Sequence, residues 1–267
     1  MFPFRDHNPS GRTPIVTYAL IALNVLIFLT YWAELDNARY MHALLTNWAM
    51  VPEFISQGYG QAGLLTSIFL HGGVMHLLGN MLFLYIFGDN IEDELGSAKF
   101  LGFYLGTGIL ANLAQHAIAP ISDVPVIGVP GAVAGVMGAY LLLYPKPRVD
   151  IILIFIIFFK IFTLRAWVVL GIWIAMQFLG GFGSDPETGG VAYWAHIGGF
   201  VACMAIIYPR CPAHPSCAFC RATRGVPPPP EPIFTLPQSP LPHIPRTPPP
   251  LLRTPHASTP LPLLHLL

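Results

Sequence analysis

Six apolar runs of a length that suits a lipid bilayer divide most of this chain, and they constrain its fold more than any other feature. The runs cover residues 14–33, 64–88, 99–119, 126–144, 151–182 and 190–208. A helix needs about 20 predominantly apolar residues to cross the hydrocarbon core. Charged residues make up only 10% of the chain and apolar residues 54%, with a mean hydropathy of +0.60. The sequence therefore predicts an all-α integral membrane protein.

The first and fifth runs need separate interpretation. The first follows a polar start, MFPFRDHNPSGRTP, and lacks a small-residue cleavage site after it, so we expect a retained span rather than a secretory signal. The fifth run is too long for one helix and contains Lys160 and Arg165. We interpret 151–163 as an apolar segment at the membrane interface and 165–182 as the helix.

The basic residues predict the topology. If the chain crosses the membrane six times, both termini lie on the same side of it. The loops near 89–99 and 145–165, which follow the second and fourth spans, then lie on that side as well. Nearly all Lys and Arg residues then fall on it: Arg5, Arg12, Lys99, Lys146, Arg148, Lys160, Arg165, Arg210, Arg221, Arg224, Arg246 and Arg253. The opposite side holds Arg39 alone. By the positive-inside rule we expect cytoplasmic termini, and we place the protein in a prokaryotic plasma membrane.

Composition divides the chain into three parts. We expect a cytoplasmic N-terminal segment at 1–13, a six-helix membrane domain at 14–208, and a cytoplasmic tail at 209–267. The tail is dominated by proline and has no apolar period, so we expect disorder with polyproline character. It could serve as a ligand for an SH3-like module or be passive.

A cysteine cluster, CPAHPSCAFC, opens the tail. Its potential zinc ligands are Cys211, His214, Cys217 and Cys220. The spacing is not that of a standard zinc knuckle, and only one CxxC is present. Free or lipidated thiols beside the membrane are the alternative. On the cytoplasmic side predicted for the tail, disulfides are not expected.

The second apolar run contains the polar sequence LHGGVMHLLGNM. His76 and Asn80 are four residues apart, so on a helix they lie one turn apart on the same face. Polar groups are costly inside a bilayer, and those that persist are candidates for function. Alternatively, the two side chains bond each other or a neighbouring backbone group and only fix the packing of helices.

The fourth run, VIGVPGAVAGVMGAYLLLYP, predicts a short helix. A helix from Pro130 to Tyr144 rises only about 22 Å, less than the hydrocarbon core of about 30 Å. Its first turn is therefore predicted to lie below the membrane surface. The irregular backbone that precedes it must then lie inside protein or along a water-filled cavity. We expect such a cavity to open to the outer side.

Two helix faces with small side chains are predicted to pack together. They consist of His196, Gly199 and Cys203 in the sixth run and of Gly131, Gly135 and Ala139 in the fourth. Small residues spaced in this way let two backbones approach closely. Such packing would bring His196 near position 130. A lone histidine is more often a packed structural residue, but beside His76, Asn80 and a submerged cavity a functional role becomes the better interpretation.

These features resemble the rhomboid family of intramembrane serine proteases. The resemblance covers about residues 1–208. It is carried by LHGGVMHLLGNM, GDNIEDELG, GVPGAVAGVMGAYLLLYP and GGVAYWAHIGGF, in that order. It implies a six-helix rhomboid-like bundle with a short, submerged fourth helix, and substrates that are single transmembrane segments cut near their outer ends. No cofactor is implied.

The resemblance also implies roles for individual residues. His196 takes the position of the general base, and His76 and Asn80 take those of the oxyanion hole. Gly199 lets two helices meet, and we assign helix packing at the site to Gly128, Gly131 and Gly135 as well. The family's Gly-x-Ser-Gly is Gly128-Val129-Pro130-Gly131 here. Proline in the nucleophile position has neither the hydroxyl that attacks the substrate nor a backbone N–H.

Three functional hypotheses follow. The first is a catalytically impaired pseudoprotease that binds transmembrane segments of client proteins within the bilayer. The second is an active serine endopeptidase that uses another nucleophile or whose true sequence has serine at position 130. The third is a transporter or channel with a short broken helix at its core. No inverted repeat and no buried charge pair is evident in the sequence, which argues against it. The balance of 13 basic and 13 acidic residues gives no sign of a nucleic-acid partner.

Overall fold

The computed structural model describes residues 2–128, 130–155, 158–185 and 190–207. Its elements, in chain order, are β1 (Phe2–Asp6), α1 (Ile15–Tyr31), η1 (Trp32–Glu34), α2 (Ala38–Trp48), α3 (Pro52–Ser56), α4 (Gly63–Thr66), η2 (Ser67–Phe69), α5 (Val74–Leu95), α6 (Ser97–Ile118), α7 (Pro130–Leu143), β2 (Arg148–Phe155), β3 (Phe158–Arg165), α8 (Ala166–Gly183) and α9 (Tyr193–Ile207). Contacts along the chain separate a unit Met1–Pro228 from Pro229–Leu267. The second unit lies outside the described residues, as do the cysteine cluster and the proline-rich tail.

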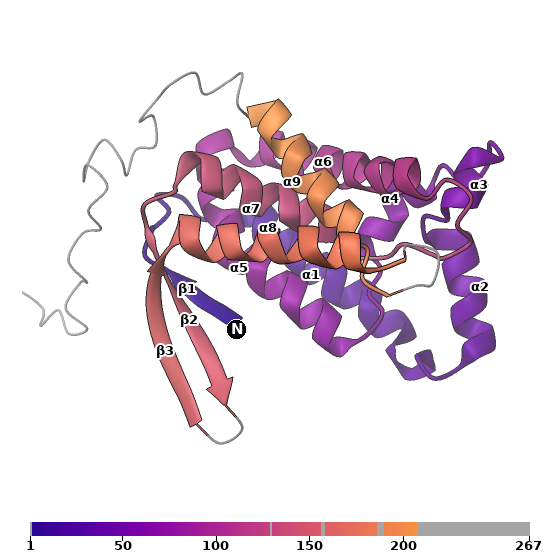
Figure 1. Ribbon diagram of the computed structural model, residues 1–267, viewed down its shortest axis with the longest axis horizontal. Coiled ribbons are helices and arrows are strands. Elements are labelled where there is room, and N and C mark those ends of the chain that lie inside the picture. Colours follow the sequence, from indigo (N-terminus) through magenta and orange to yellow (C-terminus); the bar gives the residue numbers. More distant parts are fainter. Residues whose placement is uncertain (1, 129, 156–157, 186–189, 208–267) are drawn as a thin grey trace, which may run out of the picture. The chain divides into compact units, whose positions relative to one another are not determined.

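Six helices correspond to the six apolar runs. Figure 1 shows how these helices are arranged. They are α1, α5, α6, α7, α8 and α9. Three stretches are long and apolar enough to cross a membrane: Ile15–Glu34, Val74–Leu95 and Ala166–Gly183. The helices of the fourth and sixth runs are apolar but shorter. The helical membrane bundle is confirmed, while the count of six spans stays a prediction.

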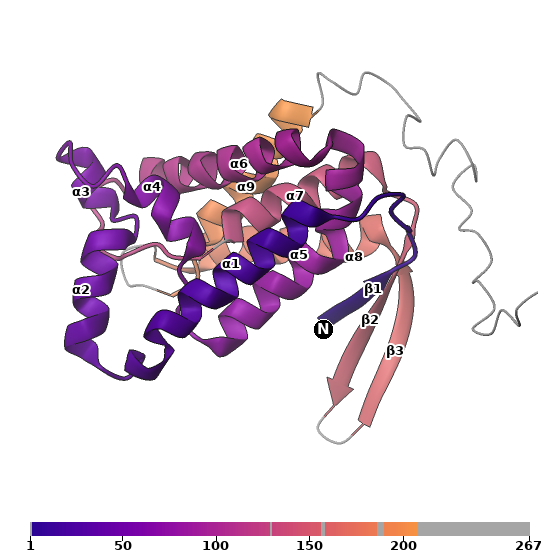
Figure 2. The same cartoon turned by 180° about the vertical axis from the view of Figure 1, so that it is seen from behind.

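The fourth run forms the short helix that its sequence predicts. Helix α7 begins at Pro130 and has 14 residues, which corresponds to a length of about 21 Å. Proline is favoured in the first turn of a helix because its missing N–H would have no intrahelical partner there. Figures 1 and 2 show α7 enclosed by other helices, and it packs against α5, α6, α8 and α9.

Between α7 and α8 the chain forms an antiparallel hairpin, β2 and β3. The apolar interfacial segment expected at 151–163 is thus part of a hairpin, which the sequence did not predict. The register pairs Arg148 with Arg165 and Val149 with Leu164. Strand β1 adds to the other edge of β2, so the order is β1-β2-β3. The segment is rich in isoleucine and phenylalanine, which favour a pleated strand. The strand β1, far away in sequence, supplies a second pairing that local inspection could not foresee.

The sequence GDNIEDELG at the end of α5 anchors the N-terminal part of the chain. The buried Glu92 carboxylate accepts hydrogen bonds from the backbone N–H groups of Val16 (3.0 Å) and Thr17 (2.8 Å) and from the hydroxyls of Thr17 (2.9 Å) and Ser97 (2.6 Å). The first N–H groups of a helix have no intrahelical acceptor. Glu92 therefore caps α1 from a different helix and fixes α1 to α5.

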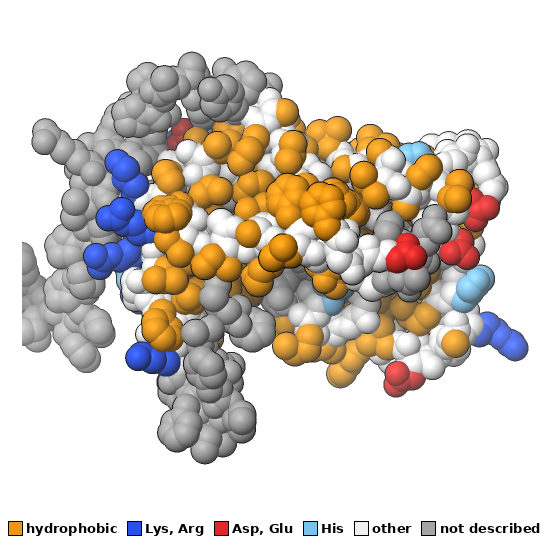
Figure 3. All heavy atoms as spheres, viewed as in Figure 1, with side chains coloured by type: hydrophobic (Ala, Val, Ile, Leu, Met, Phe, Trp, Pro, Cys, Tyr) orange, Lys and Arg blue, Asp and Glu red, His pale blue; other side chains and the backbone are white. Residues whose placement is uncertain are grey.

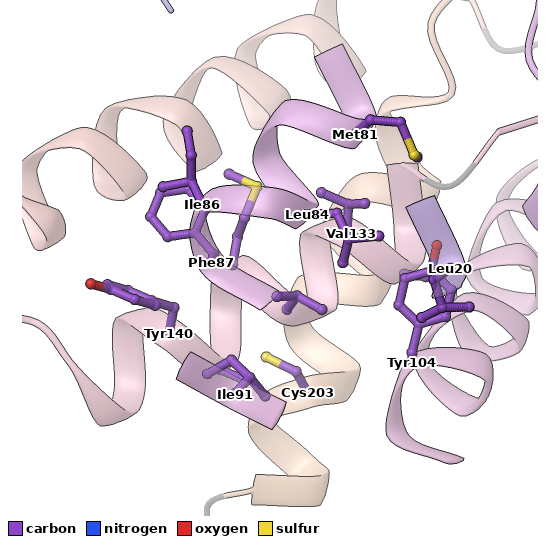
Figure 4. Close-up of a cluster of buried hydrophobic side chains, with 14 of the residues drawn as sticks. Leu20, Met81, Leu84, Ile86, Phe87, Ile91, Tyr104, Val133, Tyr140 and Cys203 are labelled. Atoms are coloured by element: carbon purple, nitrogen blue, oxygen red, sulfur yellow. The ribbon is translucent and has the colours of Figure 1, made fainter. Parts of the chain in front are cut away.

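The apolar core lies around α5 and α7. Figure 4 shows Leu84 and Phe87 of α5 near Val133 and Tyr140 of α7. The rings of Phe87 and Tyr140 meet edge to face with their centroids 4.8 Å apart. Edge-to-face pairs of this kind hold the relative rotation of two helices as well as burying area. The core thus fixes α7 relative to α5.

Basic side chains gather at one end of the helices. On the face shown in Figure 3, most Lys and Arg side chains lie where the sheet joins the helices. Helix α2, which carries Arg39, lies at the other end of α1 (Figures 1 and 2). The two ends therefore differ in charge as the sequence predicts. Which compartment each end faces stays a prediction.

Candidate functional site

The segment before α7 is held in place by backbone hydrogen bonds. Met50 and Val126 exchange two of them, at 3.1 and 2.8 Å. The N–H of Gly128 donates to the carbonyl oxygen of Ser67 at 2.9 Å. Gly128 has φ = 106°, a conformation that side-chain-bearing residues rarely adopt. Gly128 lies before the first residue of α7, where its positive φ lets the chain turn into the helix. Its role here is therefore conformational, whereas the sequence predicted a role in helix packing.

Helices α7 and α9 meet at glycines, as the small-residue faces predict. A β-carbon on Gly199 would overlap the backbone carbonyl of Gly131. Two details differ from the expected packing. A β-carbon on Gly135 would meet Thr107 of α6, and it is Gly138 that lies against Cys203. The helix has small residues on more than one face, so sequence alone could not assign each to a neighbour.

His196 of α9 forms a short hydrogen bond that the sequence analysis did not identify. Its Nδ1 lies 2.6 Å from Oε1 of Gln177 in α8. The Gln177 Nε2 in turn donates to the carbonyl oxygen of Trp173 at 3.2 Å. The indole ring of Trp173 meets the imidazole edge to face, with centroids 5.5 Å apart. A signal was present, because Gln177 is an amide within an otherwise apolar span.

His76 of α5 lies beside His71, with ring centroids 5.3 Å apart in an edge-to-face arrangement. Its Nδ1 accepts a long hydrogen bond, 3.4 Å, from the N–H of Gly72. His71 is fully buried, and its backbone N–H and carbonyl oxygen both bond the hydroxyl of Tyr31, at 2.7 and 3.1 Å. The structure thus places His76 beside a second, fully buried histidine.

Asn80 lies one turn beyond His76 on α5. Its side-chain nitrogen Nδ2 is buried and has no hydrogen-bond partner among the described residues. Within the described residues, Nδ2 of Asn80 therefore bonds neither His76 nor a backbone group, and the choice between a structural and a functional role stays open. An unpaired buried amide costs free energy. Such a group in a folded protein needs an explanation, for example strain, a catalytic role or a bound water or ion.

A small cavity lies near the start of α9. Its volume is about 30 Å³, and it is lined by α3, α6, the segment 122–126 and the start of α9. His76, Asn80 and His196 are not part of its lining. None of the residues that line this space belongs to α7. The outward cavity expected above α7 therefore stays a prediction.

No group of three or more potential metal-ligating side chains occurs among the described residues. The possible zinc ligands Cys211, His214, Cys217 and Cys220 all lie outside that part of the chain. Cys203 is described as a free, buried thiol that donates to the carbonyl oxygen of Phe200 at 2.9 Å.

Helix α7, which begins at Pro130, thus packs against α9, whose His196 is held at Nδ1 by the amide of Gln177. Helix α5 contributes His76 and the unpaired Nδ2 of Asn80. This fold and site define a helical membrane protein with a polar site between its apolar helices. Residues 59–213 match the Rhomboid domain family. The chain belongs to the rhomboid family.

The similar proteins come from bacteria and from organelles. The rhomboid protease GluP of Bacillus subtilis is 36% identical over 129 residues, which are 48% of this chain and 24% of GluP. Rhomboid protein 1, mitochondrial, of Saccharomyces cerevisiae is 27% identical over 197 residues, 72% of this chain and 52% of that protein. The human presenilin-associated rhomboid-like protein, mitochondrial, is 29% identical over 163 residues, 60% of this chain and 40% of the human protein. The chain thus spans about a quarter to a half of the length of these curated relatives.

Proposed function

We propose that this rhomboid-family membrane protein binds transmembrane segments of other membrane proteins within the bilayer and does not cleave them. Pro130, the first residue of α7, carries the proposal. It occupies the nucleophile position of the Gly-x-Ser-Gly sequence, and proline has no hydroxyl to form an acyl-enzyme. Loss of the nucleophile from a Ser–His enzyme removes about six orders of magnitude of kcat.

The rest of the site supports binding. His196 occupies the general-base position, and His76 and Asn80 occupy the oxyanion-hole positions. The unpaired Nδ2 of Asn80 is a donor suited to a peptide carbonyl oxygen. A client helix that unwinds locally beside α5 exposes such carbonyls, and inside a bilayer they must find a donor within the protein. A buried amide donor without a partner therefore favours a peptide ligand.

The proposed arrangement in the membrane follows the basic residues. The end with the sheet faces the cytoplasm or its equivalent, so that the N-terminal segment 1–13 and the tail 209–267 lie there. The prokaryotic plasma membrane stays a prediction, since the similar proteins include bacterial and mitochondrial members.

A cleavage assay in liposomes tests the loss of the nucleophile. The wild type, Pro130→Ser and Pro130→Ser with His196→Ala are each reconstituted with a single-pass substrate of rhomboid proteases. We expect no cleavage by the wild type, cleavage by Pro130→Ser, and its loss in the double variant. Labelling with a serine-reactive fluorophosphonate should follow the same order. Cleavage by the wild type that depends on His196 would instead establish an active protease with another nucleophile.

A binding assay tests the second half of the proposal. The wild type and a fluorescently labelled client transmembrane segment are reconstituted together, and energy transfer is measured as the lipid-to-protein ratio rises. We expect transfer to persist at dilutions where a segment of the same length and scrambled sequence no longer associates. Equal transfer for the two segments would show that the site does not select clients.

A further inference from the structure

Gln177 forms hydrogen bonds with both ends of its side-chain amide. It is the only residue of α8 whose side chain carries an amide, a hydroxyl or a charge, and it is buried. Its Oε1 lies 2.6 Å from His196 Nδ1, and its Nε2 lies 3.2 Å from the carbonyl oxygen of Trp173, one turn earlier. An amide in an apolar helix is costly unless both ends are paired. Here both ends are paired, and one partner is the histidine of the candidate site.

The carbonyl of Trp173 determines the orientation of this amide. A carbonyl oxygen can only accept a hydrogen bond, so the atom of Gln177 that faces it must be the NH₂ group. The oxygen Oε1 then faces His196. Because Oε1 is also only an acceptor, Nδ1 of His196 must carry the proton of the bond between them.

The protonation of Nδ1 decides what Nε2 of His196 offers. A neutral imidazole carries one proton, so with Nδ1–H the nitrogen Nε2 has a free lone pair. A lone pair at Nε2 is what a general base needs to take a proton from a hydroxyl. If the proton were on Nε2 instead, that nitrogen could only donate. The tautomer of His196 therefore determines what the site can do, and the residue that bonds Nδ1, Gln177, belongs to a different helix, α8.

We propose that Gln177 is a positioning residue that holds His196 as the Nδ1–H tautomer and presents Nε2 as an acceptor. This role deepens the proposed function and rests on it in one respect, namely that His196 belongs to the client-facing site. Trp173 takes part through its carbonyl, which orients the amide, and through its ring, which lies against the imidazole.

Gln177 could instead serve only as an interhelical contact between α8 and α9. Two substitutions separate these roles. Gln177→Leu keeps the approximate size and removes the acceptor. Gln177→Glu keeps an acceptor facing Nδ1 and removes the NH₂ group that bonds Trp173. A purely structural role predicts that both variants lose stability and that neither changes the tautomer of His196.

Nitrogen-15 NMR of histidine-labelled protein in nanodiscs measures the tautomer directly. The His196 signals are assigned by their loss in His196→Ala. In the wild type we expect a protonated, pyrrole-type Nδ1 and an unprotonated, pyridine-type Nε2. Gln177→Leu should shift the population toward the Nε2–H form, and Gln177→Glu should keep Nδ1 protonated. Met176→Leu, an exposed neighbour in α8, should leave the spectrum unchanged.

An Nε2–H form in the wild type would overturn the proposal, and so would an unchanged tautomer in folded Gln177→Leu. If Gln177→Leu does not fold, the wild-type spectrum alone still tests the proposal, because it shows which nitrogen of His196 carries the proton. The result is independent of cleavage by the wild type, so a failure here is distinct from a failure of the proposed function. In Pro130→Ser, once active, Gln177→Leu should lower kcat by about 10²- to 10⁴-fold with little change in KM, and Gln177→Glu should restore part of it.

Discussion

Gly199 of α9 lies so close to Gly131 of α7 that a β-carbon on Gly199 would overlap the carbonyl group of Gly131. The contact joins the helix that carries His196 to the first turn of the helix that begins at Pro130. Gly199 is about one turn beyond His196 on α9, so the backbone at His196 is positioned relative to α7 by this approach. The absence of a side chain at Gly199 therefore allows α9 to approach the first turn of α7 closely.

Substitution of Gly199 should separate these helices. In Gly199→Ala the new methyl group meets backbone atoms, which cannot rotate away as a flexible side chain can. We expect a loss of about 1–3 kcal/mol in the free energy of unfolding, measured by titration with a denaturing detergent. Gly171→Ala in α8 is the matched control, because a β-carbon there has no atom within 4 Å. Equal stability of the two variants would contradict the packing of α7 on α9.

Asn80 should be dispensable for stability and needed for binding. Its Nδ2 has no partner among the described residues, so Asn80→Leu removes an unpaired buried donor and should leave the melting temperature unchanged or raise it. Energy transfer to the client segment should fall. Asn112 is the control, since its Nδ2 bonds both the Leu64 carbonyl and the Ser67 hydroxyl at 2.9 Å. Asn112→Leu should cost about 1–3 kcal/mol; a comparable loss for Asn80→Leu would mean that Asn80 is structural.

Glu92 should be essential for attaching α1 to the bundle. Glu92→Ala removes a buried carboxylate and leaves the N–H groups of Val16 and Thr17 without their acceptor. Hydrogen bonds to a charged group contribute about 1.5–3 kcal/mol each, so we expect a loss above 2 kcal/mol and faster proteolysis near residue 15. Glu53→Ala, at a carboxylate that accepts from exposed Gln57, should change neither measurement. An undisturbed α1 in Glu92→Ala would refute the capping role.

Asp6 should make the stability of the protein depend on pH. Burial raises the pKa of Asp6 from 3.8 to about 7, although the hydrogen bond from the Tyr140 hydroxyl (2.7 Å) acts in the opposite direction and Asp89 adds to the rise. The folded state therefore binds the proton more tightly than the unfolded state. The stabilisation is fully present below pH 3.8 and is lost as the pH rises through about 7.

The melting temperature between pH 4 and pH 8 tests this dependence. In the wild type, the ionisation of Asp6 should lower the melting temperature as the pH rises. This contribution should be missing in Asp6→Asn, which we expect to be more stable than the wild type at pH 8. Asp36→Asn, at an exposed carboxyl, should follow the wild type. A wild-type melting temperature that rises over the same interval, with no difference in Asp6→Asn, would contradict the raised pKa.

Local pattern predicted the helices well and the sheet poorly. The start of α7 at Pro130 follows from proline chemistry, and its length follows from the run between two prolines. The hairpin β2–β3 was missed, because a run of isoleucine and phenylalanine suits an interfacial segment as well as a strand. Pairing with β1, about 145 positions away by register, is a tertiary event that no short window contains.

The sequence by itself determined that this chain is a rhomboid-family helical membrane protein with proline where the family has its serine nucleophile. The length of an apolar run and the residues of a motif are local properties, so each can be recognised from one segment of the sequence alone. Only the tertiary structure decided that Gln177 faces His196, that Asn80 lacks a partner and that Glu92 caps α1. Each of these depends on the distance and angle between atoms of different helices, which are set by packing and not by spacing along one chain segment.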